Sequence, residues 1–173
     1  RLASPWSSPA CAISGTDMRL LWITAAVAFV LDQITKYGVI YGLALQPGQS
    51  YELLPPLVTF RKGLNTGINF GLLHGHPDIT RWALFALALA ICVALVIWAK
   101  RSFTRTAEFA SAGLVLGGAL GNAVDRVFHR GVLDFLNMSC CGINNPYIFN
   151  VADIFIFAGA IGLLVWGGSK KAA

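Results

Sequence analysis

The feature that most limits how this sequence can fold is the stretch from Trp82 to Ala99, which contains 18 residues and no charged side chain. Arg81 and Lys100 border it directly. At about 1.5 Å per residue, a helix of this length nearly matches a bilayer hydrocarbon core of about 30 Å. The whole chain is 56% hydrophobic and 12% charged, whereas soluble domains carry about 25% charged residues. We therefore expect an integral membrane protein.

Three other stretches are apolar enough to be membrane spans, and helix is the default because lipid offers the backbone no hydrogen-bond partners. The expected spans cover about residues 20–43, 82–99, 107–127 and 150–167. The third span carries Gly113, Gly117 and Gly121 at a spacing of four, which predicts close helix packing. Residues 18–173 would form a single four-helix domain. Residues 1–17 are rich in Ser, Pro and Ala, and we interpret them as a disordered leader or cloning remnant, with Met18 a plausible natural start.

Lysine and arginine residues predict the orientation of these spans, since they are enriched on the cytoplasmic side. Arg19 precedes the first span, three cations lie in the link after the second, and two lysines follow the fourth. With four spans, all these cations fall on one side: Arg19, Lys100, Arg101, Arg105, Lys170 and Lys171. Both termini are then cytoplasmic, and residues 44–80 and 128–149 face outward. Some outward cations weaken the bias, namely Arg61, Lys62, Arg81, Arg126 and Arg130.

The first outward segment is too long for a tight turn. From Tyr51 to Phe70 it mixes β-favouring residues with Pro55, Pro56 and Gly63. This pattern predicts a small platform of strands and turns on the membrane surface. The expected fold is thus an all-α integral membrane protein with four transmembrane helices and a small extracytoplasmic β-platform.

Charged residues inside a span are costly and therefore informative. Asp32 and Lys36 are four residues apart on one face of the first span. They form either an internal ion pair that fixes helix packing or a pair that positions substrate and handles protons. The ion pair is the simpler interpretation, because pairing is how buried charges are usually tolerated.

A second group of polar residues falls near the outer surface. Asn122, Asp125 and Arg126 end the third span, Asp153 lies in the first turn of the fourth, and Asp134 lies in the link between them. The three carboxylates would thus lie near one depth. The group is either structural, with Arg126 neutralising Asp125, or the site of a two-carboxylate hydrolase. Spacing alone leaves both open.

Other chemistries find little support in the sequence. It contains neither HExxH nor GxSxG, the signatures of zinc peptidases and serine hydrolases. His74 and His76 lack further ligands, and the adjacent Cys140 and Cys141 show no CxxC spacing. The net charge of +5 comes from the short links between spans, so it indicates topology and not nucleic-acid binding. We expect no metal and no cofactor.

Several segments, in this order, resemble the motifs of the lipoprotein signal peptidases. They are DQITK (residues 32–36), NTGINFG (65–71), GGALGNAVDR (117–126) continuing to VLDF (132–135), and FNVAD (149–153). Each motif alone is weak, but the ordered set on this topology is specific. The resemblance covers about residues 19–168. Ile68 and Asn69 stand where the family usually has small apolar residues, and residues 137–142 match no motif.

The resemblance implies a membrane aspartic endopeptidase. It would remove the signal peptide from diacylglyceryl-modified prolipoproteins, cutting just before the lipidated cysteine. By motif, Asp134 and Asp153 would be the catalytic carboxylates, with Asp125 and Arg126 bracing the site. Other matching positions would support the site or hold the substrate: Asp32, Lys36, Asn65, Gly67, Asn122, Asn150 and Ala152.

The same resemblance implies a multi-pass protein of the bacterial inner membrane, with its active site at the outer face. Membrane lipid and the prolipoprotein would be its partners, and we expect a monomer. The alternative is a small transporter or assembly factor that uses the intramembrane charges as a polar pathway. Transporters commonly carry repeated halves, and the two helix pairs show no such similarity.

Overall fold

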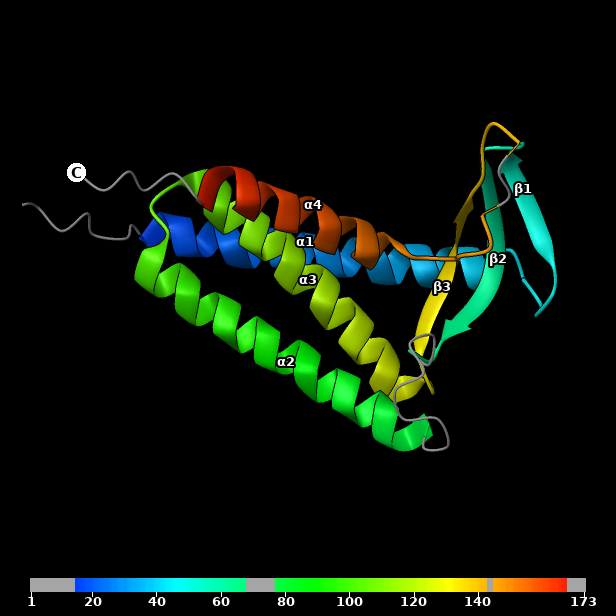
Figure 1. The fold of residues 1–173 in the computed structure, drawn as a ribbon, viewed down its shortest axis with the longest axis horizontal. Coiled ribbons are helices and arrows are strands. Elements are labelled where there is room, and N and C mark those ends of the chain that lie inside the picture. The colour runs from blue at the N-terminus through cyan, green and yellow to red at the C-terminus, as the bar shows by residue number, and fades with distance from the viewer. Residues whose placement is uncertain (1–14, 68–76, 143–144, 168–173) are drawn as a thin grey trace, which may run out of the picture.

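The computed structural model describes residues 15–67, 77–142 and 145–167. Within them the chain forms, in order, α1 (Gly15–Ile40), β1 (Ser50–Leu54), β2 (Val58–Asn65), α2 (Pro77–Ser102), α3 (Thr106–Phe128), β3 (Val132–Met138) and α4 (Val151–Gly167) (Figure 1). The helices run side by side, and the sheet lies across one end of them. Some residues singled out in the sequence lie outside the described part: residues 1–14, Ile68, Asn69, His74, His76, Lys170 and Lys171.

In the part of the chain that the structure describes, three helices are long and apolar enough to cross a membrane. They are residues Asp17–Ile40 of α1, Asp78–Ser102 of α2 and Thr106–Phe128 of α3. The fourth expected span coincides with α4, which is apolar but has only 17 residues. The fold is therefore mostly helical with several apolar helices, as a multi-pass membrane protein requires.

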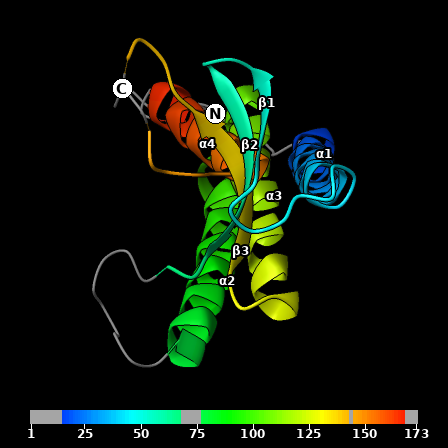
Figure 2. The same cartoon turned by 90° about the vertical axis from the view of Figure 1, so that its right-hand side faces the viewer.

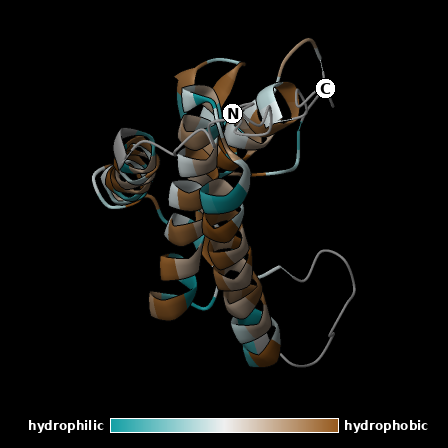
Figure 3. Cartoon of the chain, turned by 90° about the vertical axis from the view of Figure 1, so that its left-hand side faces the viewer, coloured by the Kyte–Doolittle hydropathy of each residue, from teal (hydrophilic) through white to brown (hydrophobic). Residues whose placement is uncertain are grey.

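Large apolar side chains cover the outside of the bundle. On α4, Phe157 is 71% exposed and Leu164 is 80% exposed, and the brown colour of hydrophobic residues recurs along the helices in Figure 3. Soluble monomers rarely expose continuous apolar surface on this scale. In a bilayer these side chains would face lipid.

Helix α3 lies at the centre of the bundle and contacts the other three helices. A side chain at Gly113, Gly117 or Gly121 would collide with α1, where Leu21, Ala25 and Asp32 approach. The predicted glycine stripe is thus confirmed as a close helix contact. On another side of α3, a side chain at Gly118 would collide with the backbone of Ala152 in α4.

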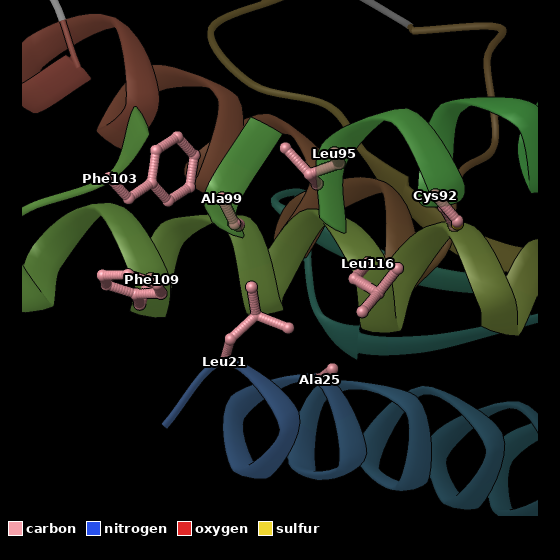
Figure 4. Close-up of a cluster of buried hydrophobic side chains, with 10 residues drawn as sticks. Leu21, Ala25, Cys92, Leu95, Ala99, Phe103, Phe109 and Leu116 are labelled. Carbon is pink, nitrogen blue, oxygen red and sulfur yellow. The ribbon is translucent and has the colours of Figure 1, made fainter. Parts of the chain in front are cut away.

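One apolar cluster lies in the half of the bundle far from the sheet, and a smaller one, of Ile40, Leu133 and Phe135, lies where α1 meets the sheet. Leu95 and Ala99 of α2 pack toward Leu116 and Phe109 of α3, and Leu21 of α1 closes the cluster (Figure 4). The cluster packs α1, α2 and α3 against one another, and the nearby buried Glu108 accepts the backbone N–H groups of Thr104 and Arg105 at the start of α3.

The expected platform is a three-stranded antiparallel sheet in the order β1-β2-β3. Figure 2 shows it lying across the ends of the helices. β1 and β2 fall in the predicted segment, whereas β3 lies in the later outward link, which the sequence did not mark as a strand. The β2–β3 register places Asp134 opposite Gly63. The sheet therefore brings one of the expected carboxylates back to the helix ends.

Candidate active site

The polar residues singled out in the sequence come from elements that meet at the end of the bundle where the sheet lies (Figure 1). Asp32 and Lys36 come from α1, Asn122, Asp125 and Arg126 from the last turns of α3, Asp134 from β3, and Asn150 and Asp153 from the start of α4. Most of them are buried even though they are polar. Buried polar groups need partners, so the partners of each carboxylate reveal its role.

Asp153 is oriented by the start of its own helix. Its backbone N–H donates to Asn150 Oδ1 at 3.0 Å, and the Asn150 backbone N–H donates to Asp153 Oδ2 at 3.2 Å. This reciprocal pattern is a capping box. The other carboxylate oxygen of Asp153, Oδ1, accepts a hydrogen bond of 2.9 Å from Asn122 Nδ2. Both oxygens thus face N–H donors in the first turn of a helix, where negative charge is favoured.

Asp134 has a different environment. It is 2% exposed, and its Oδ1 accepts a bond of 2.6 Å from Asn150 Nδ2. Burial, followed by the nearby charge of Asp153, raises the pKa of Asp134 to about 6, although hydrogen bonds from Asn150 and Asn65 oppose that rise. This carboxyl group therefore holds a proton more readily than an ordinary aspartate.

Two amide side chains join the carboxyl groups. Asn150 contacts Asp134 through its side chain and Asp153 through its capping bonds. Its Nδ2 also donates to Asn122 Oδ1 at 3.1 Å, and Asn122 in turn donates to Asp153. Asp134 and Asp153 thus belong to one continuous hydrogen-bonded network.

Two cavities open beside this network. One of about 200 Å³ is lined by Asp134 together with Gly63, Leu64, Asn65, Thr66, Pro146, Tyr147 and Ile148. The other, of about 440 Å³, is apolar and runs along α4 beside Asp153, lined by Phe149, Ile154, Phe157, Ala158 and Ile161. The two carboxyl groups therefore border a mainly polar space and a mainly apolar one.

Lys36 lies behind this pair with all of its donors used. Its Nζ is 2.8 Å from Asp32 Oδ2, 2.8 Å from Asp125 Oδ2 and 3.0 Å from Asn122 Oδ1. An ammonium group has three donors, so these acceptors satisfy it fully. The predicted Asp32–Lys36 ion pair is confirmed, and Asp125 is its unexpected third member.

The predicted neutralisation of Asp125 by Arg126 is wrong. Among the described residues, Asp125 pairs with Lys36, and Arg126 has no carboxylate within salt-bridge distance. Its Nη1 donates to the Asn122 carbonyl at 2.9 Å. The Arg126 guanidinium still interacts electrostatically with Asp125, Asp134 and Asp153. Adjacent helical residues point in different directions, so each side chain reaches different neighbours.

The ionic cluster of Asp32, Lys36 and Asp125 also binds the backbone beside each carboxylate of the pair. Asp32 Oδ1 accepts the Ala152 N–H at 2.9 Å, and Asp125 Oδ2 accepts the Leu133 N–H at 3.0 Å. Ala152 precedes Asp153, and Leu133 precedes Asp134. The ionic cluster therefore fixes the position of β3 relative to α4.

Asn65 lines the polar cavity, and Gly67 forms the turn that follows it. The Gly67 N–H donates to Asn65 Oδ1 at 3.0 Å, and Gly67 has a φ of +76°, a conformation that side chains disfavour. This local turn orients the Asn65 side chain, which bonds Asp134. Gly67 thus contributes through backbone shape.

Gln33 is a polar residue whose role the sequence did not reveal. Its Nε2 lies 3.1 Å from Asp32 Oδ2 and 3.4 Å from Asp125 Oδ1. It therefore spans the two acidic members of the ionic cluster. The available signal was its position between Asp32 and Lys36 in the first motif, since a polar amide inside a span needs a buried partner.

The described residues contain no group of three or more His, Cys, Asp or Glu side chains that would hold a metal. Cys92, Cys140 and Cys141 are free thiols. His74 and His76 lie outside the described residues, so the structure does not place them. Two linked carboxyl groups, one of them buried and proton-holding, are suited to activating water and protonating a leaving group. Fold and site together are thus of the kind expected of a membrane hydrolase with a carboxyl pair.

Comparison with known proteins gives the family. A family model described as signal peptidase (SPase) II matches residues 24–167. Lipoprotein signal peptidases from Methylobacterium sp. (strain 4-46) and Nostoc punctiforme are each 42% identical, over 142 and 150 residues. The first alignment covers 82% of this chain and 84% of the relative, and the second 85% and 88%.

Solved structures agree with this result. A bacterial membrane enzyme solved by the in meso method at 1.9 Å resolution has a TM-score of 0.75 and 27% identity. The alignment covers 91% of this chain and 95% of that one. The chain belongs to the signal peptidase II family, the lipoprotein signal peptidases, and is an aspartic peptidase that processes prolipoproteins. The transporter alternative is not favoured.

Proposed function

We propose that Asp134 and Asp153 are the catalytic pair of this peptidase. The observation that carries the proposal is that Asn150 hydrogen-bonds both residues where β3 meets the first turn of α4. Within the described residues, these two carboxylates have no lysine at salt-bridge distance, whereas Asp32 and Asp125 both bind Lys36. An acid–base pair needs titratable groups that are free to exchange protons.

The two members would take different roles at the start of the reaction. Asp134 would hold the proton, since burial and the nearby Asp153 charge raise its pKa to about 6. Asp153, which accepts N–H donors on both oxygens, would take a proton from the attacking water. Asp134 would then protonate the leaving nitrogen. Two nearby carboxyl groups sharing one proton supply both functions without a metal or cofactor.

Neighbouring residues would support this chemistry in separate ways. The Arg126 cation would stabilise negative charge as it develops on the carboxyl pair and the substrate carbonyl. Asn65, Asn122 and Asn150 would hold the carboxyl groups in place. The remaining expected residues act through geometry: the ionic cluster of Asp32, Lys36 and Asp125, the backbone of Ala152 and the turn at Gly67.

The substrate would be a prolipoprotein whose cysteine carries a diacylglyceryl group, cut just before that cysteine. The apolar groove of about 440 Å³ along α4 supports this choice. It begins at Asp153 and extends along the side of α4 that would face lipid. Acyl chains in the groove would bind with about 0.8 kcal/mol per buried CH₂. Residues 18–173 would suffice as a single domain, acting as a monomer.

A cleavage assay with matched peptides tests this function. A diacylated prolipoprotein peptide should be cut before its cysteine, and the same peptide with an unmodified cysteine should be cut poorly. Ala158→Trp should fill the groove and slow cleavage of the diacylated peptide. Leu87→Trp, an exposed apolar position on α2 (55% exposed), is the control and should keep the original rate. Equal cleavage of both peptides would refute the role of the groove.

The orientation completes the proposal. With α4 as a fourth span of about 25 Å at 1.5 Å per residue, the α2–α3 link and the site lie at opposite ends of the bundle. Lys100 and Arg101 in the last turn of α2, together with Arg105 in that link, support its placement in the cytoplasm. The site would then face outward from the bacterial inner membrane, with both termini inside. Single cysteines at Gln49 should react with an impermeant reagent added outside, and cysteines at Thr104 should not. The reverse pattern would invert the topology.

A further inference from the structure

The end of α3 is a critical point in the site, because Asp125 and Arg126 lie in its last turn and β3 starts four residues after it. The last carbonyls of any helix lack partners within the helix. Here the Asp125 carbonyl accepts the His129 N–H at 2.7 Å. The carbonyls of Arg126 and Val127 need donors from elsewhere.

Arg81, in the first turns of α2, supplies both donors. Its Nε donates to the Arg126 carbonyl, and its Nη2 donates to the Val127 carbonyl at 2.8 Å. The guanidinium lies 4.8 Å from the centre of the Trp82 ring, which holds its plane in place. A cation at a helix C-terminus is also favoured by the helix dipole.

The turn that follows is held from its other side by the ionic cluster. Asp125 Oδ2 accepts the Leu133 N–H at 3.0 Å, and a side chain at Gly131 would collide with the Asn65 backbone. The turn from Val127 to Gly131 is therefore fixed between Arg81 outside and Asp125 inside. Arg126 lies at its start, and Asp134 lies three residues beyond its end.

We propose that Arg81 is a positioning residue of the peptidase, which fixes the last turn of α3 so that the Arg126 guanidinium stays directed at the carboxyl pair. This proposal rests on the role given above to Arg126. It also explains why an arginine occurs at the outward end of α2, where the positive-inside tendency disfavours it. The orphan carbonyls of the neighbouring helix require a fork-shaped donor there, and arginine has that shape.

A double-mutant cycle tests the proposal in the full-length protein. Arg81→Met should lower kcat/KM on the order of tenfold to a hundredfold, as small displacements at an active site do. Arg81→Lys keeps the cation and should recover part of that loss. Arg101→Met removes an exposed cation at the opposite end of α2 and should leave the rate unchanged. Released signal peptide is quantified by mass spectrometry over long incubations, so slow variants remain measurable.

The decisive comparison repeats Arg81→Met in an Arg126→Lys background. If Arg81 acts through Arg126, the loss caused by Arg81→Met should shrink to about twofold or less there, while its effect on the melting temperature should be equal in both backgrounds. An undiminished loss in the double mutant, or full activity of Arg81→Met, would overturn the proposal. Full activity of Arg126→Lys would instead refute the role of Arg126 in the site.

Discussion

Two sets of acidic side chains lie side by side at the same end of the bundle and differ in what they bind. Asp32 and Asp125 are fully buried, and both pair with Lys36 at 2.8 Å. Asp134 and Asp153 are held by the amides of Asn150 and Asn122. A buried lysine shared by two carboxylates fixes them in place through ion pairs, whereas amides orient a carboxyl group through hydrogen bonds alone. The first set is therefore suited to holding structure and the second to exchanging protons.

The two sets are also connected, so the structural one determines the geometry of the other. Asn122 Oδ1 accepts bonds from both Lys36 and Asn150, so its Nδ2 must face Asp153. The backbone bonds to Ala152 and Leu133 add a second connection. The comparison thus predicts that the sets respond differently to the same Asp→Asn change.

The largest effect should come from the amide-bound pair. Asp134→Asn and Asp153→Asn keep the side-chain shape but remove a titratable group, so each should lower kcat by roughly 10²- to 10⁴-fold. The double variant should be little worse, because residues acting as a unit are not additive. Cleavage rates of the four proteins provide the measurement. Substantial activity in Asp134→Asn would mean that the wrong aspartate has been assigned.

Substitutions in the ionic cluster should act mainly by lowering the stability of the fold. Lys36→Met leaves two buried carboxylates without their cation, and breaking a buried ion pair from one side costs about 3–5 kcal/mol. We expect a strongly lowered melting temperature and low yield in detergent. Thr35→Val, on the same helix at a partly exposed position, is the control. A Lys36→Met protein of normal stability would contradict the structural assignment of the cluster.

The two sets should also differ in whether an Asp→Asn substitution raises or lowers the melting temperature at neutral pH. Burial and the nearby charge of Asp153 raise the pKa of Asp134 from its ordinary value of 3.8 to about 6 in the folded protein. Folding is therefore favoured while Asp134 keeps its proton, and that stability is lost as the pH rises from about 4 through about 6. Asp134→Asn has no charge to bury, so its melting temperature should exceed that of the unchanged protein above pH 6.

Asp125→Asn should do the opposite at the same pH, because it removes one of the two carboxylates that neutralise Lys36. Melting curves between pH 4 and pH 8 test both expectations together. If Asp134→Asn were destabilised at pH 7 as much as Asp125→Asn, the distinction between the two sets would not hold.

Much of the fold could be predicted because it depends on local patterns. An uncharged run such as 82–99 and a glycine stripe on 113–121 have direct physical meaning along one helix. The depth of Asp125, Asp134 and Asp153 followed from where the spans end. The Asp32–Lys36 pair followed from a spacing of four residues. Each of these inferences needed only neighbours in sequence.

What could not be predicted depends on contacts between distant residues. Asp125 lies 89 positions beyond Lys36, so no spacing rule links them, and the adjacent Arg126 was the natural but incorrect partner. The strand β3 was missed because VLDFLNM is too short and too irregular to show alternation. Its strand character comes from pairing with β2. Arg81 was counted only as a topology signal, although it donates to carbonyls on α3.

The smallest expected effect is none at all, and it tests whether the amide-bound pair is sufficient for the chemistry. Two carboxyl groups that share a proton supply both the base and the acid of peptide hydrolysis, so strong chelators should leave the cleavage rate unchanged. The assay should include a zinc peptidase as a positive control, since that enzyme must lose activity under the same conditions. Replacing Cys140 and Cys141 with Ser should also leave the rate within about twofold, because surface substitutions of this kind are usually close to neutral. A loss on chelation that added zinc restores would show that the carboxyl pair does not act alone. Asp134 and Asp153 would then be reinterpreted as ligands or neighbours of a metal, and His74 and His76 would be the first residues to substitute.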